Sequence, residues 1–204
     1  MKIKIINNDF SVAKIGLDRI TTLVSAKVHN CIYRPRLSIA DGTAPRVCLY
    51  RAPPGYGKTV ALAFEWLRHR TTGRPAVWIS LRASSYSEFD ICAEIIEQLE
   101  AFELVKFSHA REGVSKPTLL RDLASSLWQS TSSNEIETLI CLDNINQGLG
   151  LPLLHALMEF MLETPKSIRF AVAGNTIKGF SRLKLAGAMQ EHTEKDLAFS
   201  ADEA

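Results

Sequence analysis

The residues with the clearest chemical meaning lie between positions 52 and 59, in the sequence APPGYGKT. Gly55 and Gly57 lack a Cβ atom, so the backbone can turn sharply there and point successive N–H groups toward an anion. Lys58 adds a positive side chain, and Thr59 adds a hydroxyl that can ligate a divalent cation. A helix pattern begins at this point, and a helix N-terminus also favours negative charge. The stretch therefore predicts a loop that binds phosphate groups.

One position departs from the usual pattern of such loops, which places a glycine five residues before Gly57. Ala52 stands there, and alanine fits only if its φ angle is negative. The alternative interpretation is a glycine-rich strand-to-helix turn with an exposed lysine. The apolar run before the loop and the amphipathic pattern after it favour phosphate binding. The loop residues expected to contact a nucleotide are Pro54, Gly55, Tyr56, Gly57, Lys58, Thr59 and Val60.

A second candidate is Asp143, which follows the apolar run LICL. A carboxylate at the C-terminal tip of a buried strand can hold Mg²⁺ directly or through water. Aspartate is also a common turn former, so this position alone leaves both interpretations open. Together with the loop, it predicts an Mg²⁺ site shared by Thr59 and Asp143. Asn144 comes next, and its amide can hydrogen-bond a water molecule but cannot accept a proton from it.

The elements that must position these residues alternate along the chain. Apolar runs predict strands at residues 47–50, 76–81, 138–142 and 168–173, with helical patterns between them. Ser87, followed by Asp90, predicts the start of one helix. A weak helical pattern covers residues 183–189, and a short fifth strand is expected near residues 192–197. The series predicts an α/β fold: a mostly parallel five-stranded sheet with helices on both faces, which binds ligands at the carboxyl ends of its strands.

Three regions follow from this pattern. Residues 1–32 carry a mixed pattern, notably over residues 15–28, and are expected to form an N-terminal arm or cover. Residues 33–197 form the expected domain, with a short helix that ends near Asp41 and Gly42. Residues 198–204 are expected to begin a further region.

Composition sets the remaining limits. The 204 residues are 46% hydrophobic, which is enough for one core, and the formal net charge is +2, which alone argues for neither nucleic acid nor membrane. Basic residues outnumber acidic ones between Arg34 and Arg82, which suits a polyphosphate ligand and equally suits a solvated surface. The four cysteines lack metal-site spacing. Without an apolar signal segment or a membrane-length apolar run, the expected location is the cytoplasm.

The ordered set of motifs resembles the N-terminal ATPase domain of MalT-like, LuxR-type transcriptional regulators, which belong to the STAND class of AAA-like P-loop NTPases. The resemblance covers about residues 33–204. Its markers are RPRL (34–37), APPGYGKT (52–59), FEWL (64–67), WISL (78–81), ICLDN (140–144), RLKLAG (182–187) and DLAFSADEA (196–204).

This resemblance implies an ATP- or ADP-binding switch with Mg²⁺, in which the segment from Tyr33 to Leu37, including Arg34, lines the adenine side. It also implies that hydrolysis is absent or very slow. The family usually has a second aspartate at Asn144, an arginine where Gly174 and Asn175 stand, and an aspartate at Arg82. Asn144 and Asn175 therefore occupy catalytic positions without the usual catalytic groups.

Members of this family continue through a sensor region to a DNA-binding helix-turn-helix, which this sequence does not contain. It is therefore expected to be one piece of a longer regulator or a stand-alone remnant. As it stands, we expect it to bind nucleotide, to bind no specific DNA site, and to self-associate through apolar surface. The alternatives are a stand-alone P-loop ATPase or small-molecule phosphotransferase, and a degenerate protein that binds nothing.

Overall fold

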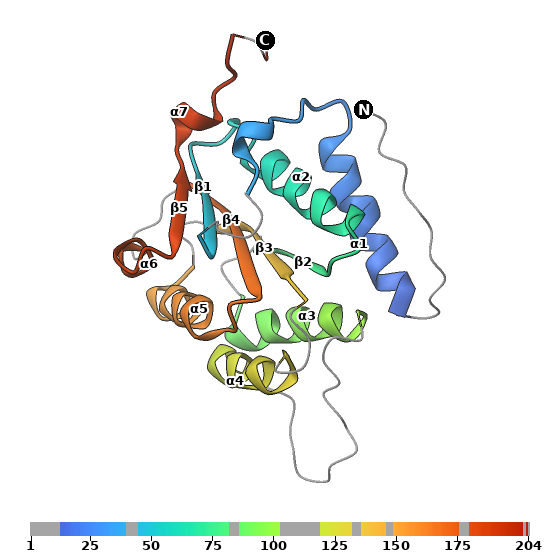
Figure 1. Ribbon diagram of the computed structural model, residues 1–204, viewed down its shortest axis with the longest axis vertical. Coiled ribbons are helices and arrows are strands. Elements are labelled where there is room, and N and C mark those ends of the chain that lie inside the picture. The colour runs from blue at the N-terminus through green and yellow to red at the C-terminus, as the bar shows by residue number, and fades with distance from the viewer. Residues whose placement is uncertain are drawn as a thin grey trace.

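The computed structural model describes residues 13–39, 45–81, 86–102, 119–131, 136–145, 149–175, 180–201 and 203. At its centre lies a five-stranded parallel sheet with the order β2-β3-β4-β1-β5 (Figure 1). The strands are β1 (Val47–Arg51), β2 (Ala76–Ser80), β3 (Thr138–Ile145), β4 (Ile168–Gly174) and β5 (Met189–His192). The predicted parallel five-stranded α/β sheet is confirmed, and β4 lies between β1 and β3.

Helices cover both faces of the sheet (Figure 1). On one face lie α1 (Ala13–Val28) and α2 (Lys58–Thr71), and on the other lie α3 (Glu88–Glu100), α4 (Leu120–Thr131) and α5 (Leu151–Glu163). The short helices α6 (Ser181–Leu185) and α7 (Glu194–Leu197) contact β5, and a 3-10 turn, η1, spans Pro35–Leu37. Within the described ranges, no helix is long and apolar enough to cross a membrane.

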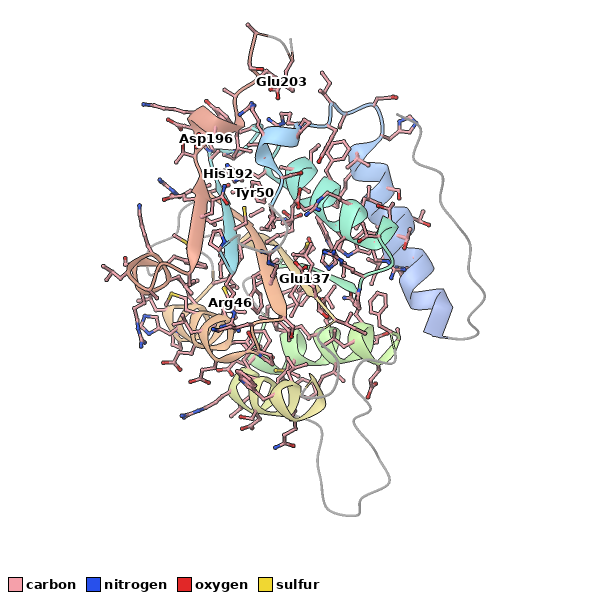
Figure 2. The ribbon with its side chains drawn as sticks, viewed as in Figure 1. Arg46, Tyr50, Glu137, His192, Asp196 and Glu203 are labelled. Carbon is pink, nitrogen blue, oxygen red and sulfur yellow. The ribbon has the colours of Figure 1, made fainter. Side chains whose placement is uncertain are left out.

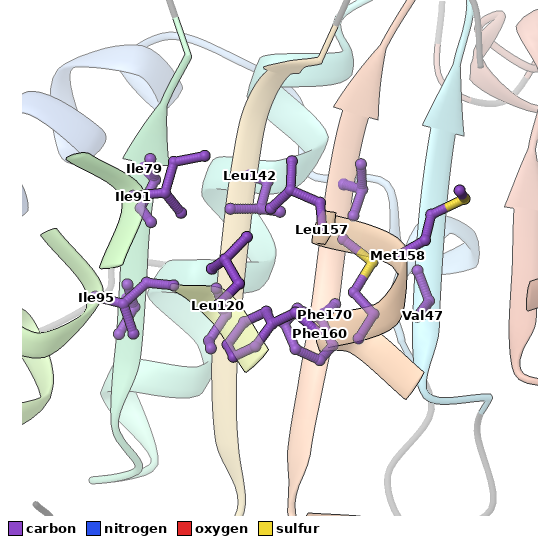
Figure 3. Close-up of a cluster of buried hydrophobic side chains, with 14 of the residues drawn as sticks. Val47, Ile79, Ile91, Ile95, Leu120, Leu142, Leu157, Met158, Phe160 and Phe170 are labelled. Carbon is purple, nitrogen blue, oxygen red and sulfur yellow. The ribbon is translucent and has the colours of Figure 1, made fainter. Parts of the chain in front are cut away.

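The core has two layers because side chains alternate along each strand. In β1, Val47 and Leu49 face the α3–α5 layer, whereas Cys48 and Tyr50 face the α1–α2 layer. Figure 3 shows the first layer, where aliphatic side chains of the sheet meet those of the helices and Phe160 lies edge-on to Phe170. Strands buried on both faces read as continuous apolar runs, which explains why the runs of β1 to β4 were predictable.

The structure differs from the sequence-based prediction in several elements. Residues 15–28, which carry a mixed pattern in the sequence, lie within one continuous helix, α1. The short helix expected after the RPRL segment is instead a 3-10 turn within it, and its predicted end at Asp41 and Gly42 lies outside the described residues. The strand β3 continues past Leu142 to Ile145, with a register shift on the way. The fifth strand ends at His192, where it was predicted to begin, and a helical turn follows.

Helix α3 begins where predicted and also closes one edge of the sheet. Ser87 accepts a hydrogen bond from the Asp90 N–H, and Asp90 accepts from the Ser87 N–H, so the expected cap is present. Further along α3, the Gln98 side chain accepts from the Trp78 N–H at 2.8 Å and donates to the Trp78 carbonyl at 2.9 Å. Because β2 is an edge strand, this amide satisfies backbone groups that have no neighbouring strand.

Tyr50 and His192 lie side by side on β1 and β5 (Figure 2), with ring centroids 5.3 Å apart and ring planes 13° from parallel. Burial lowers the pKa of His192 and raises the pKa of Tyr50. The cause is that either charged ring would lose its hydration. Both rings therefore stay neutral in the folded protein at neutral pH.

We expect the free energy of unfolding to fall as the pH is lowered through about 6.5, the usual pKa of histidine. Between this value and the lower pKa of the folded state, the unfolded chain takes up a proton on His192 more readily than the folded chain, so stability is lost as the pH falls through this range. His69, whose pKa burial also lowers, acts in the same direction. Urea titrations at about pH 7.5 and 5.5 measure the change.

The variant His192→Phe keeps an aromatic ring beside Tyr50. It should reduce the difference between the free energies of unfolding measured at the two pH values. A substitution of the exposed His155 by glutamine serves as the control and should leave the difference unchanged. Equal pH dependence in His192→Phe and the parent protein would contradict this assignment.

Candidate functional site

The glycine-rich loop connects β1 to α2 at the carboxyl end of the sheet. Gly55 and Gly57 have φ angles of 91° and 74°, which side chains with a Cβ atom rarely adopt. Gly57 is also the residue from which α2 begins. Ala52 is buried, and it is not among the described non-glycine residues with positive φ, so the condition set by its side chain is met. The loop therefore has the backbone shape that the sequence requires.

Lys58 is the first residue of α2, and its side chain bends back across the loop. Its Nζ donates to the Pro53 carbonyl at 2.8 Å. Burial lowers the pKa of Lys58, whereas the negative charge of Asp143 acts in the opposite direction. The ammonium group of Lys58 thus lies over the loop and close enough to Asp143 to interact with its charge.

Thr59 and Asp143 lie together, although 84 positions separate them in the sequence. The Thr59 hydroxyl donates to Asp143 Oδ1 at 2.9 Å, and the Asp143 residue is only 1% exposed. The contact joins the first turn of α2 to the carboxyl end of β3. A hydroxyl and a carboxylate are hard oxygen donors, and Mg²⁺ usually takes few protein ligands beside phosphate and water. The donor set therefore fits Mg²⁺.

Arg34, which the resemblance assigns to the adenine side, lies beside the glycine-rich loop. Its guanidinium donates to the Leu197 carbonyl at 2.5 Å and to the Gly57 carbonyl at 3.5 Å, and it lies 5.2 Å from the centre of the Phe199 ring. Burial lowers the pKa of Arg34. The side chain therefore joins the loop to the C-terminal segment. A depression beside it is lined by Tyr33, Arg34, Leu37, Ala61, Phe64 and Glu65.

The remaining predicted residues lie around this centre. Pro54 and Tyr56 are exposed on the loop, and Val60 is half-buried in the first turn of α2. Asn144 follows Asp143 with a φ of 67° and is exposed. Asn175 is exposed just after β4, at the same carboxyl end of the sheet as Asp143. The predicted position Arg82 lies outside the described residues.

Lys27 is a site residue that the sequence did not indicate. It lies in the last turn of α1, with its Nζ 3.8 Å from Asp143 Oδ2 and 5.7 Å from the centre of the Trp78 ring. No motif links it to Asp143, because the contact depends on how α1 packs on α2. Its presence places a second lysine at the candidate metal site.

The glycine loop between β1 and α2, together with β4 inserted between β1 and β3, defines an α/β P-loop fold. In agreement, a chain in a solved structure of Drosophila ORC bound to AT-rich DNA and Cdc6 aligns with a TM-score of 0.50 and 12% identity. The alignment covers 96% of this chain and 64% of that one. At this level of identity, the likeness concerns the fold alone.

In sequence, the chain is similar to curated transcriptional regulators. It is 98% identical over 204 residues to the HTH-type transcriptional regulator AlkS of Pseudomonas putida. This alignment covers 100% of this chain and 23% of that protein. It is 30% identical over 181 residues to AlkS of Alcanivorax borkumensis, over 86% of this chain and 19% of that protein. It is 26% identical over 184 residues to MalT of Vibrio campbellii, over 87% of this chain and 20% of that protein. No family model matches the chain. The chain thus spans less than a quarter of each of these relatives.

Proposed function

We propose that this chain is a nucleotide-binding module that holds ATP or ADP together with Mg²⁺. The observation that carries the proposal is the 2.9 Å hydrogen bond between Thr59 and Asp143 at the carboxyl end of the sheet. It brings a loop built for phosphate and a buried carboxylate into one place. An isolated glycine turn would not need a buried aspartate beside it.

Each part of the site has a separate role in this proposal. The loop backbone around Gly55 and Gly57 donates N–H groups to the phosphate oxygens, and the N-terminus of α2 adds its partial positive charge. Lys58 moves from the Pro53 carbonyl to a terminal phosphate. Thr59 and Asp143 hold Mg²⁺, whose charge offsets that of the polyphosphate.

We further propose that the module serves transcriptional regulation as part of a longer LuxR-type regulator. The similarity to AlkS and MalT regulators supports this role, and it extends over the whole chain in the case of AlkS from Pseudomonas putida. The nucleotide would act as a switch, bound by this module and read by regions beyond it. By itself the chain is proposed not to select a DNA sequence, since its net charge of +2 supplies little counterion release.

Rapid hydrolysis is not part of the proposal. The side chain after Asp143 is Asn144, whose amide cannot act as a general base. Asn175 supplies no positive charge where phosphoryl transfer would need it, and such a loss can lower the rate by ~10³-fold or more. The module is therefore proposed to hold its nucleotide for long periods.

The proposal is tested by titrating the protein into a fluorescent ATP analogue, with Mg²⁺ and with EDTA, and by competition with ATP, ADP and adenosine. We expect binding that Mg²⁺ tightens, competition by ATP and ADP, and little competition by adenosine. Phosphate release in the same samples should stay far below about 1 s⁻¹, an ordinary enzymatic rate. Failure of ATP and ADP to compete would refute nucleotide binding, and rapid phosphate release would favour an ATPase.

A further inference from the structure

Helix α1 reaches the candidate metal site through one charged side chain. Val24 is fully buried in the layer between α1, α2 and the sheet, with Ile20 and Val28 packed against the same cluster. This packing carries the last turn of α1 to the end of β3. There Lys27 Nζ lies 3.8 Å from Asp143 Oδ2, on the carboxylate oxygen that Thr59 does not contact.

The position of Lys27 is set by two partners. Its ammonium group lies near the carboxylate of Asp143 and also 5.7 Å from the centre of the Trp78 ring, a distance that permits a cation–π interaction. The Lys27 side chain is 24% exposed and that of Asp143 only 2% exposed. The negative charge of Asp143 is thus balanced by a lysine from another element, in the place where a metal ion would balance it.

A magnesium ion and the Lys27 ammonium group would compete for the Asp143 carboxylate. Mg²⁺ bound to Asp143 would add two positive charges within a few ångströms of the ammonium group, and charges this close repel strongly when partly buried. Each cation therefore weakens the binding of the other. By thermodynamic linkage, a lysine that opposes the metal is itself displaced by the metal, to the same extent in free energy.

We propose that Lys27 holds the end of α1 against Asp143 in the metal-free protein, and that Mg²⁺ with nucleotide releases it. The inference rests on the proposed function, because it requires Asp143 to hold the metal of a bound nucleotide. It makes α1 the element that senses whether the site is loaded. Helix α1, which precedes β1 in the chain, thus takes part in the switch through a contact that forms and breaks.

The variant Lys27→Met tests this inference because it removes the charge and keeps most of the apolar stem. It should tighten Mg²⁺-dependent ATP binding roughly fivefold, the effect expected for a partly exposed ion pair, and change the affinity measured in EDTA much less. Arg19→Met is the matched control, since Arg19 is an exposed basic residue of the same helix. Lys27→Gln provides a second variant in case Lys27→Met folds poorly.

A second measurement needs no variant. Hydrogen exchange in residues 20–28 of the parent protein should become faster when ATP and Mg²⁺ are added together, and should not with ATP in EDTA. Unchanged or weaker Mg²⁺-dependent binding in the Lys27 variants would overturn the inference, as would unchanged exchange in α1. If the parent protein binds no nucleotide under either condition, the proposed function fails and this inference fails with it.

Discussion

Alanine in place of Lys58 is expected to weaken ATP binding by roughly 10- to 100-fold, because hydrogen bonds to a charged group contribute about 1.5–3 kcal/mol each. In the structure, Lys58 Nζ already lies over the loop, 2.8 Å from the Pro53 carbonyl oxygen. An entering phosphate can take over that ammonium group without movement of the backbone. Removing the side chain leaves the loop shape intact, since Gly55 and Gly57 set it.

The measurement is a titration of the labelled ATP analogue in Mg²⁺, with thermal unfolding as a check on folding. Lys166→Ala is the control, because Lys166 is an exposed lysine. The loss should be larger for ATP than for adenosine, which carries no phosphate. Equal affinity of the parent protein and Lys58→Ala for ATP would show that the loop does not bind phosphate.

The second large effect concerns stability. Alanine in place of Gly174 should lower the free energy of unfolding by roughly 3 kcal/mol or more. A Cβ atom at Gly174 would lie 2.1 Å from the carbonyl oxygen of Ile145 and 3.1 Å from its carbonyl carbon. Both are backbone atoms of β3, which is paired with β4 here, so they cannot rotate away. The close approach of the two strands beside Asp143 therefore depends on this glycine.

Gly73→Ala is the matched control in urea titrations. Unlike Gly174, Gly73 has a positive φ, of 77°, but a Cβ atom there would meet nothing within 4 Å. The Gly73→Ala variant should lose only about 1 kcal/mol in free energy of unfolding, which is the cost of placing alanine in this backbone conformation. If Gly174→Ala were no more harmful than Gly73→Ala, the strand contact would have to be looser than it is in the structure.

The central part of the fold could be predicted because its signals are local. The strands β1 to β4 are buried on both faces, so their sequences are continuous apolar runs. Ser87 with Asp90 marks the start of α3 through a capping pattern that is local in the sequence. The strand β5 could not be located correctly because its residues, MQEH, are mostly half-buried and become a strand by pairing with β1. The Thr193 and Asp196 cap, which starts α7 directly after it, was a missed signal of the same kind as the α3 cap.

The candidate site was predictable only where its residues belong to a local sequence motif. Thr59 and Asp143 each belong to a pattern that points to metal and phosphate. Lys27 belongs to none, because α1 is a helix held in place by the buried Val24 more than by its own pattern. The position of Arg34 depends on Leu197, at the far end of the chain. Contacts of this kind follow from how elements pack, which local sequence does not encode.

The amide of Gln98 also affects how copies of this protein meet. An uncovered outer strand offers its peptide groups to any similar strand, so that one sheet can continue into the next and molecules join into ribbons. At Trp78 both peptide groups are already engaged, by a side chain that is itself only 7% exposed. A neighbour that approached β2 would have to extract this buried glutamine before it could add a strand. At this edge, the molecule is therefore protected against aggregation by sheet extension.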